Sequence, residues 1–264
     1  MQNININGYK ALLYCFGLSS SRYIEYATAL DYLKKEPREK ILDIGSGHSI
    51  FPSILKNEGF DVFVVDNARE SLVWQKKKTK SPGSKRHLKV ALSSGERLPF
   101  DDSTFSSVTA ISVIEHVPDD RGVAREIGRV LKSHGTCIVS VPATPLTETL
   151  TNTHWTYGVP TFPRMWLRPT LGVVFKRFNV DRRDKDYLIR EYCTRDVLKR
   201  IVEPSGCALE KIAPFENVIA KLIYKSIIPS GVLTPIELFL VAKFTNIGES
   251  IKNVGGVIIK MRKP

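Results

Sequence analysis

Short apolar runs alternate with amphipathic stretches between residues 40 and 141 of this 264-residue chain. The runs have the length and continuity of strands that are buried on both faces of a sheet, and the stretches between them have helical spacing. We predict strands over residues 40–44, 61–66, 88–92, 106–112 and 135–141. We predict helices over residues 50–57, 68–78 and 120–132. This order predicts an α/β fold, with a parallel sheet, helices on both faces and right-handed crossovers.

The regions outside this alternation have other patterns. Residues 1–37 are predicted to form a helical cap, with its clearest helix over 22–35. After the alternating region we predict a helix and two strands, over residues 194–206, 207–215 and 255–264. The chain is therefore divided into the cap, 1–37, and one main domain, 38–264, with substrate-side insertions at about 142–192 and 216–250. Within the domain, Gly135 is expected to make the turn that ends the preceding helix.

The stretch ILDIGSGHS, residues 41–49, places an acid and two glycines directly after the first predicted strand. A glycine turn at this place in an α/β sheet is typical of a nucleotide site. A dinucleotide site has a third glycine where this chain has Ile50, and its pyrophosphate would face Asp43. Two like charges about 4 Å apart repel by about 4 kcal/mol at an effective dielectric constant of about 20. The turn therefore disfavours NAD and FAD.

S-Adenosylmethionine carries an ammonium and a sulfonium group and no phosphate, so it suits an acidic turn. Asp43 can attract the ammonium group. Asp66, at the end of the second predicted strand, can accept hydrogen bonds from both ribose hydroxyls. Two acids around a glycine turn thus favour a cationic nucleoside as the cofactor.

Five sequence blocks extend this interpretation: ILDIGSGHS, VVD, GERLPFDDSTFSSV, ISVIEHV and REIGRVLKSHGTCIVSVPA. In this order they resemble the class I S-adenosylmethionine-dependent methyltransferases, in particular the small-molecule, type 11-like subgroup. The resemblance covers about residues 38–142 and is weaker over 190–213. It implies a Rossmann-like fold with a mostly parallel seven-stranded sheet, whose last strand is antiparallel, and helices on both faces.

The resemblance also implies the cofactor contacts. At the methionine end these would be Asp43, Gly45, Ser46 and Gly47, and at the ribose Asp66. Around the adenine they would be Asn67, Ser94 and Gly95. Ile111 and Ser112 would lie beneath the sulfonium. Ser94 stands where the family usually has Asp, and its hydroxyl would accept from the adenine amino group more weakly than a carboxylate. Glu96 matches the acid of the family motif, and we expect a structural role for it.

His116 is the candidate catalytic residue, because a histidine pKa near neutrality suits the deprotonation of a hydroxyl. The alternative is that His116 only packs locally or caps the next helix. Some ubiquinone-pathway O-methyltransferases of this subgroup carry E-x-x-E-H, which is thought to hold a metal. Ser112 replaces the first Glu here, so we predict no metal. A sulfonium is an activated donor, and positioning alone supplies much of the rate, so the reaction does not require an obvious base.

The net charge and the cysteine content indicate which partners and which cellular compartment to expect. The formal net charge is +12, and residues 75–89 alone hold seven Lys and Arg. This run is either a solvated helix end and loop or a binding site for an anionic partner. Four cysteines without a C-x-x-C pair indicate a reducing, cytoplasmic setting. We see no secretory signal and no uninterrupted apolar span.

The acceptor is less well defined. The D/N-P-P-Y/F and Pro-Cys motifs of nucleic-acid methyltransferases are absent, which argues against a nucleic-acid partner and makes an RNA methyltransferase the weakest alternative. Aromatic residues over 154–169 suit an apolar or ring-bearing acceptor, or core packing. The apolar stretch 218–244 suits buried helices, or peripheral contact with an anionic membrane. We predict methyl transfer to a small-molecule or lipid-like acceptor, at oxygen. The second hypothesis is a non-catalytic binding or scaffolding relative; the sequence does not indicate an oligomeric state.

Overall fold

The computed structural model describes residues 20–78, 88–143, 190, 192–217 and 254–264. Most of the N-terminal cap, of the two predicted insertions and of the basic run lies outside these ranges. So does the apolar stretch 218–244, with the buried helices or membrane contact that it predicts.

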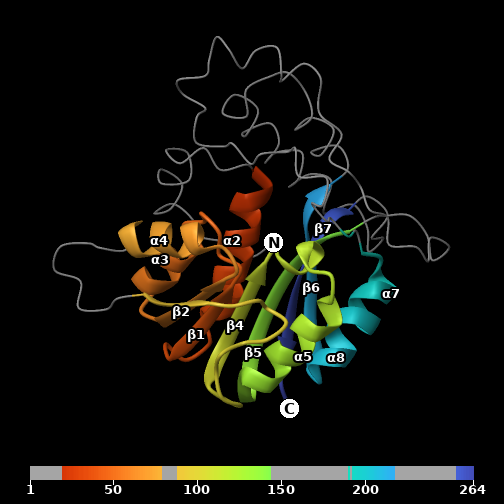
Figure 1. Ribbon diagram of the computed structural model, residues 1–264. Coiled ribbons are helices and arrows are strands. Elements are labelled where there is room, and N and C mark those ends of the chain that lie inside the picture. The colour runs from red at the N-terminus through yellow and green to blue at the C-terminus, as the bar shows by residue number, and fades with distance from the viewer. Residues whose placement is uncertain (1–19, 79–87, 144–189, 191, 218–253) are drawn as a thin grey trace, which may run out of the picture.

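Seven strands form one sheet in the order β3-β2-β1-β4-β5-β7-β6 (Figure 1). Their bounds are β1 Lys40–Ile44, β2 Asp61–Asp66, β3 Lys89–Leu92, β4 Phe105–Ile111, β5 Leu131–Pro142, β6 Ala208–Asn217 and β7 Val254–Arg262. The first five strands pair in parallel, and β7 pairs antiparallel with both β5 and β6. The predicted mostly parallel sheet with an antiparallel last strand is therefore confirmed.

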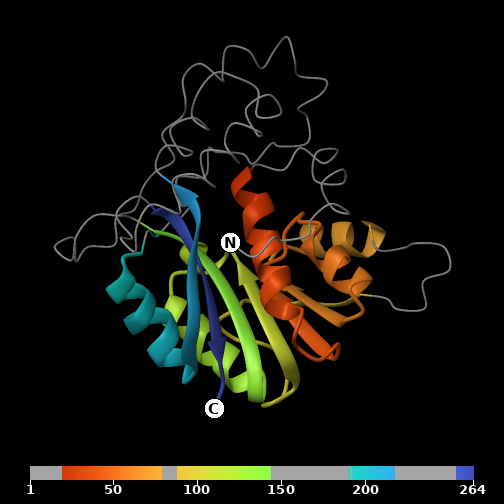
Figure 2. The same cartoon turned by 180° about the vertical axis from the view of Figure 1, so that it is seen from behind.

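Helices cover both faces of the sheet, as Figures 1 and 2 show from opposite sides. One group consists of α2 Ser20–Leu33, α3 Phe51–Asn57 and α4 Arg69–Lys78. The other consists of η1 Ile114–His116, α5 Asp120–Val130 and a continuous helical run of α7 Thr194–Val197, η2 Leu198–Val202 and α8 Glu203–Ser205. The predicted helix over 194–206 thus contains a π-helical middle, η2.

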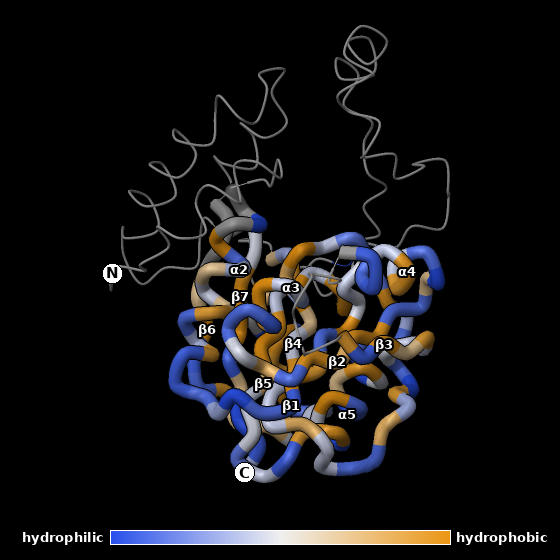
Figure 3. Tube along the Cα trace, turned by 90° about the vertical axis from the view of Figure 1, so that its left-hand side faces the viewer, coloured by the Kyte–Doolittle hydropathy of each residue, from blue (hydrophilic) through white to orange (hydrophobic). Residues whose placement is uncertain are grey.

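Two apolar cores lie on the two faces, because successive strand residues point to opposite sides. In β1, Ile41 joins the core beneath α2 and α3, whereas Leu42 joins the core beneath α5. Every residue of β4 is buried, including the polar Ser106, Ser107 and Thr109, because helices cover both faces of the sheet at this central strand. Figure 3 shows the same arrangement, with hydrophobic segments along the strands and hydrophilic ones at the ends of the sheet.

The predicted turn at Gly135 is wrong in its detail. Helix α5 ends at Val130, two residues earlier than expected, and Gly135 lies within β5. The left-handed residue is His134, with φ 60°. Gly135 is required for a different reason, since a Cβ there would lie 2.8 Å from the carbonyl oxygen of Lys132. Its own carbonyl accepts from the backbone N–H of Lys263, so the C-terminal residues hold this turn.

Candidate functional site

The strand register gathers the predicted cofactor residues at one edge of the sheet. Asp66 pairs with Leu92 of β3, and Asp43 pairs with Thr109 of β4. All four strands are parallel, so their carboxyl ends meet at this edge. The edge is the place where open α/β sheets bind their ligands.

The Asp66 carboxylate organises the glycine turn. It is 7% exposed and accepts hydrogen bonds from the N–H of Gly47 at 2.7 Å and of Ala68 at 2.9 Å. Gly45 and Gly47 have φ of 64° and 50°, the left-handed region that favours glycine. The acid that was predicted to contact the ribose therefore also fixes the loop in front of it.

Gln75 of α4 also holds the glycine loop, and the sequence analysis did not predict this role. Its side chain is fully buried, and Nε2 donates to the carbonyl oxygens of Gly47 and Ser49 at 3.0 and 2.9 Å. The neighbouring Trp74 meets the ring of His48 edge-on, with centroids 5.6 Å apart. In the sequence, Gln75 only begins the basic run, and no local signal marks it as a contact of the glycine loop.

Asp43 is the buried acid of the site. It is 2% exposed, and its Oδ1 accepts from the hydroxyl of Thr109 at 2.6 Å. Burial raises the pKa of Asp43 to about 7; the charge of Asp66 adds to this, and the Thr109 hydroxyl opposes it. A cationic partner would therefore stabilise the ionised form of this carboxyl and take the place of its proton.

Ser46 and Asn67 flank these acids with different surroundings. Ser46 is buried, and within the described ranges its hydroxyl has no hydrogen-bond partner. Such an orphaned group is uncommon in a folded chain and suits a polar ligand. Asn67, the residue after β2, is exposed.

The loop after β3 carries Ser94 and Gly95. The Ser94 hydroxyl donates to Oε2 of Glu96 at 3.1 Å and accepts from the Glu96 N–H at 3.2 Å. Glu96 also accepts from the N–H of Asp119 at 3.0 Å, so it links this loop to the start of α5. A Cβ on Gly95 would meet Ile44 of β1 and Val123 of α5 at 3.3 to 3.5 Å, so this residue packs closely between these two elements.

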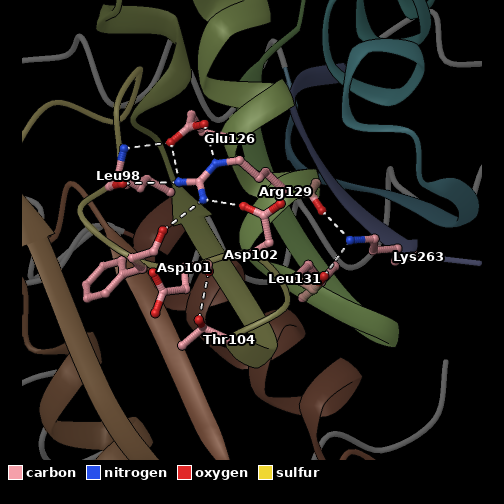
Figure 4. A network of polar contacts seen from close by, with 10 residues as sticks. Leu98, Asp101, Asp102, Thr104, Glu126, Arg129, Leu131 and Lys263 are labelled. Carbon is pink, nitrogen blue, oxygen red and sulfur yellow. Dashed lines mark hydrogen bonds and ion pairs between the residues drawn. The ribbon is translucent and has the colours of Figure 1, made fainter.

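Arg129 of α5 secures the rest of this loop (Figure 4). Its guanidinium donates to the carbonyl oxygens of Leu98 and Phe100, at 3.1 and 2.8 Å, and to the carboxylate of Asp102 at 2.7 Å. It also pairs with Glu126, whose second oxygen accepts from the Leu98 N–H at 2.7 Å. Arg129 and Glu126 thus fix the loop over residues 98–102 on α5.

Ile111 and Ser112 close β4 at the centre of the edge. Ile111 is 8% exposed and is the last residue of the strand. Ser112 follows with φ 52°, and its N–H donates to the carbonyl and hydroxyl oxygens of Ser140. A non-glycine residue with such a φ is strained, and strain of this kind clusters at functional sites.

His116 ends the short helix η1, next to the buried Glu115. The His116 side chain is 30% exposed, and its Nε2 lies 3.8 Å from Oε1 of Glu115. Burial raises the pKa of Glu115 to about 8, and the charge of Glu25 contributes. Asp119 caps α5 by accepting from the Gly122 N–H, so His116 is not the cap that our alternative expected.

Buried ion pairs of Asp120 connect residues 190–200 to the start of α5. Asp120 accepts from Arg200 at 2.7 and 2.8 Å and from the Tyr192 hydroxyl at 3.0 Å, and it pairs with Arg190. Burial acts to raise the pKa of Asp120, but these partners outweigh burial and hold it below its ordinary value. The Arg190 N–H donates to the carbonyl of Glu115 at 2.9 Å. Residues 190 and 192 therefore anchor the end of the predicted insertion beside His116.

Two further properties concern the described ranges only. No helix in them is long and apolar enough to cross a bilayer. No group of three or more His, Cys, Asp or Glu side chains in them is arranged to hold a metal ion.

Comparison with known proteins supports the family resemblance. Residues 42–139 match the family described as "Methyltransferase domain". Together with the fold, this match supports a class I S-adenosylmethionine-dependent methyltransferase. The matched residues span the strands β1 to β5 that carry the site.

Individual proteins agree with this assignment. The demethylmenaquinone methyltransferase of Corynebacterium kroppenstedtii is 26% identical over 180 residues, which are 66% of this chain and 70% of that protein. The ubiquinone biosynthesis O-methyltransferase of Aliivibrio fischeri is 30% identical over 98 residues, 37% of this chain and 41% of that one. The structure of an S-adenosylmethionine-dependent methyltransferase from Mesorhizobium loti has the same fold, with a TM-score of 0.56 and 14% identity over 91% of this chain and 98% of that one.

Proposed function

We propose that this methyltransferase moves a methyl group from S-adenosylmethionine to a small, lipid-like acceptor. The observation that carries the proposal is the pair of acids, Asp43 and Asp66, at the ends of adjacent strands on either side of a left-handed glycine turn. This donor set offers negative charge and acceptors, which suit an ammonium group and a ribose. It offers nothing that would neutralise a pyrophosphate.

The residues at this edge fit the cofactor in their chemistry. Asp43 would pair with the ammonium group and give up its proton on binding. Asp66 already accepts from two N–H groups, and a carboxylate has about four acceptor positions, so acceptors remain for the ribose hydroxyls. The orphaned Ser46 hydroxyl would gain a partner. When bound, the cofactor would supply the electrophilic methyl group of its sulfonium.

The remaining predicted contacts have supporting roles in this proposal. Asn67 and the Ser94–Gly95 turn would flank the adenine, and Ile111 with Ser112 would underlie the methionine portion. The Ser94 hydroxyl already donates to Glu96, so the hydroxyl oxygen can face the adenine amino group only as an acceptor. We therefore expect the adenine contact to contribute less than in relatives with an Asp at this position.

For the acceptor, the names of the relatives favour a quinone precursor. One relative is named for demethylmenaquinone and another for an O-methylation in ubiquinone biosynthesis. Both names fit a ring-bearing, lipid-like molecule, as does the prediction from the aromatic residues over 154–169. We propose oxygen as the methylated atom, with His116 as the base that takes the hydroxyl proton. Peripheral contact with an anionic membrane stays a prediction, because residues 79–87 and 218–253 lie outside the described ranges.

Isothermal titration calorimetry with S-adenosylmethionine tests the cofactor site. We expect micromolar binding to the wild-type chain and none to Asp66→Ala, which loses the ribose acceptor and the anchor of the glycine loop. Asp61→Asn is the matched control, since Asp61 is partly exposed at the other end of β2 and pairs with Lys89 at 2.8 Å. Absence of binding to the wild-type chain would refute the proposal.

A second assay identifies the acceptor. The protein is incubated with labelled S-adenosylmethionine and either a metabolite extract or demethylmenaquinone, and mass spectrometry shows which molecule and atom carry the label. His116→Asn should slow turnover on an oxygen acceptor and change its pH profile. His134→Asn, at the opposite edge of the sheet, should have no effect. A labelled carbon, rather than oxygen, would refute the role of His116 as a hydroxyl base.

A further inference from the structure

The helix α2 brings a buried carboxylate to the cofactor edge. It packs against the sheet beside β5, β6 and β7 (Figure 2). Its residue Glu25 is 1% exposed, and Oε1 accepts from the hydroxyls of Ser112 at 2.6 Å and Ser140 at 2.7 Å. The other oxygen pairs with Arg22, one helical turn earlier, at 3.0 Å. Glu25 thus joins the N-terminal helix to the carboxyl ends of β4 and β5.

Burial of this acid is costly and needs a reason. A buried charge loses its hydration, and an ion pair in an apolar setting seldom recovers more than that loss. An apolar residue at position 25 would pack on the sheet without this cost. The partners of Glu25 are the two serines that meet where β4 ends, so its position matters more for that junction than for the core.

Ser112 is the residue at this junction that needs support. Its φ of 52° is unfavourable for any residue with a Cβ. The bond from its hydroxyl to Glu25 and the bonds from its N–H to Ser140 favour this one conformation. Without Glu25, the Ser112 hydroxyl would lose a charge-assisted bond, and the strained conformation would lose its main side-chain support.

The conformation of Ser112 determines where the next residues lie. Val113 packs so closely on the glycine turn that a Cβ on Gly45 would come within 2.5 Å of it. Glu115 and His116 follow within one short helix, and the charges of Glu25 and Arg22 both act on Glu115. A shift at Ser112 would therefore move both the glycine turn and the candidate base.

We propose that Glu25 is a positioning residue, which holds Ser112 in its left-handed conformation and so fixes residues 112–116 beneath the cofactor. The part of this inference that concerns the cofactor rests on the proposed function. The part that concerns the loop does not, since it describes the protein without ligand.

Two measurements on the full chain test the two parts separately. Hydrogen exchange of peptides covering residues 112–117 reports on the loop, and calorimetry reports the affinity for S-adenosylmethionine. For Glu25→Ala we expect exchange in this loop to rise and affinity to fall, each by about tenfold, as is typical when a charge-assisted hydrogen bond is lost. Glu25→Gln keeps the shape and one acceptor oxygen and should lie between, which keeps the test valid if the alanine variant does not fold.

The decisive variant is the double substitution Glu25→Ala with Ser112→Gly. Glycine adopts a φ of 52° without strain, so it no longer needs Glu25. The double variant should regain most of the protection from exchange that Glu25→Ala loses. Asp31→Asn is the control on the same helix, because Asp31 is partly exposed and its carboxylate pairs with Lys34, one turn further along the chain, at 3.1 Å.

The outcomes separate cleanly. If Glu25→Ala leaves exchange and affinity unchanged, or if Ser112→Gly does not rescue it, the inference is overturned. If the loop responds as expected but the wild-type chain binds no S-adenosylmethionine, the proposed function fails and the positioning role of Glu25 holds. A loss of affinity in Asp31→Asn equal to that in Glu25→Ala would show a general effect of charge on α2, and would also overturn the inference.

Discussion

The two glycines of the cofactor turn should respond very differently to the same substitution. Both have a left-handed φ, 64° at Gly45 and 50° at Gly47. A Cβ on Gly45 would lie 2.5 and 2.7 Å from the two methyl groups of Val113, whereas a Cβ on Gly47 would meet nothing within 4 Å. Alanine at either position therefore tests backbone strain, and alanine at Gly45 adds a steric clash.

The magnitudes follow from these two effects. The left-handed backbone costs a residue with a Cβ about 1–2 kcal/mol. Overpacking of one methyl group costs about 1–3 kcal/mol more, because Val113 lies on a buried junction and has to move. We expect Gly47→Ala to lower the free energy of unfolding by about 1–2 kcal/mol, and Gly45→Ala by about 2–5 kcal/mol.

Urea unfolding of the ligand-free protein, followed by circular dichroism, measures the difference. The two variants are compared with Val113→Ala and with the double variant Gly45→Ala, Val113→Ala. Removal of the valine methyl groups makes room for the new Cβ, so the double variant should be more stable than the sum of the single effects predicts. Equal destabilisation by the two glycine variants, or strict additivity in the double variant, would refute the steric reasoning.

The remaining predictions concern acids and the loop after β3. Burial raises the pKa of Asp43 to about 7, so the affinity for S-adenosylmethionine should fall by up to about tenfold per pH unit below 7. Asp43→Asn should abolish this pH dependence. Equal wild-type affinities at pH 6 and pH 8 in calorimetry would contradict the prediction. The pKa of Glu115 is raised by burial from 4.5 to about 8, so the stability it contributes is complete at acid pH and is lost as the pH rises through 8. Glu115→Gln should therefore match the wild type in urea unfolding near pH 5 and exceed it near pH 9, and a constant difference would exclude this titration as the cause. Arg129→Ala should lower the free energy of unfolding by about 2–3 kcal/mol, because it removes the donor to the carbonyls of Leu98 and Phe100. Arg129→Lys should recover part of this loss. Urea unfolding curves like that of the wild type for both variants would contradict the role of this network.

The sequence by itself determined the sheet and the family. The strands β1, β2 and β4 lie within one residue of their predicted bounds, because the apolar residues of a parallel strand covered on both faces are not confined to alternate positions. The place of Asp43 and Asp66 at one edge also followed from the sequence, since parallel strands end on the same side. The precise turn near the start of β5 did not, because the left-handed residue is His134 and the glycine beside it serves a close contact with the carbonyl oxygen of Lys132.

Only the tertiary structure decided how the cofactor loops are held. Glu25 reaches Ser112 and Ser140 across 87 and 115 residues of sequence, and Gln75 reaches Gly47 across 28. Periodicity reports how a residue faces its own element, and it contains nothing about the partner that a long-range hydrogen bond will select. The pKa of Asp43 depends in the same way on burial by segments far along the chain. The type of cofactor could thus be predicted from local order, whereas the support of its proposed site depends on contacts that exist only once the chain has folded.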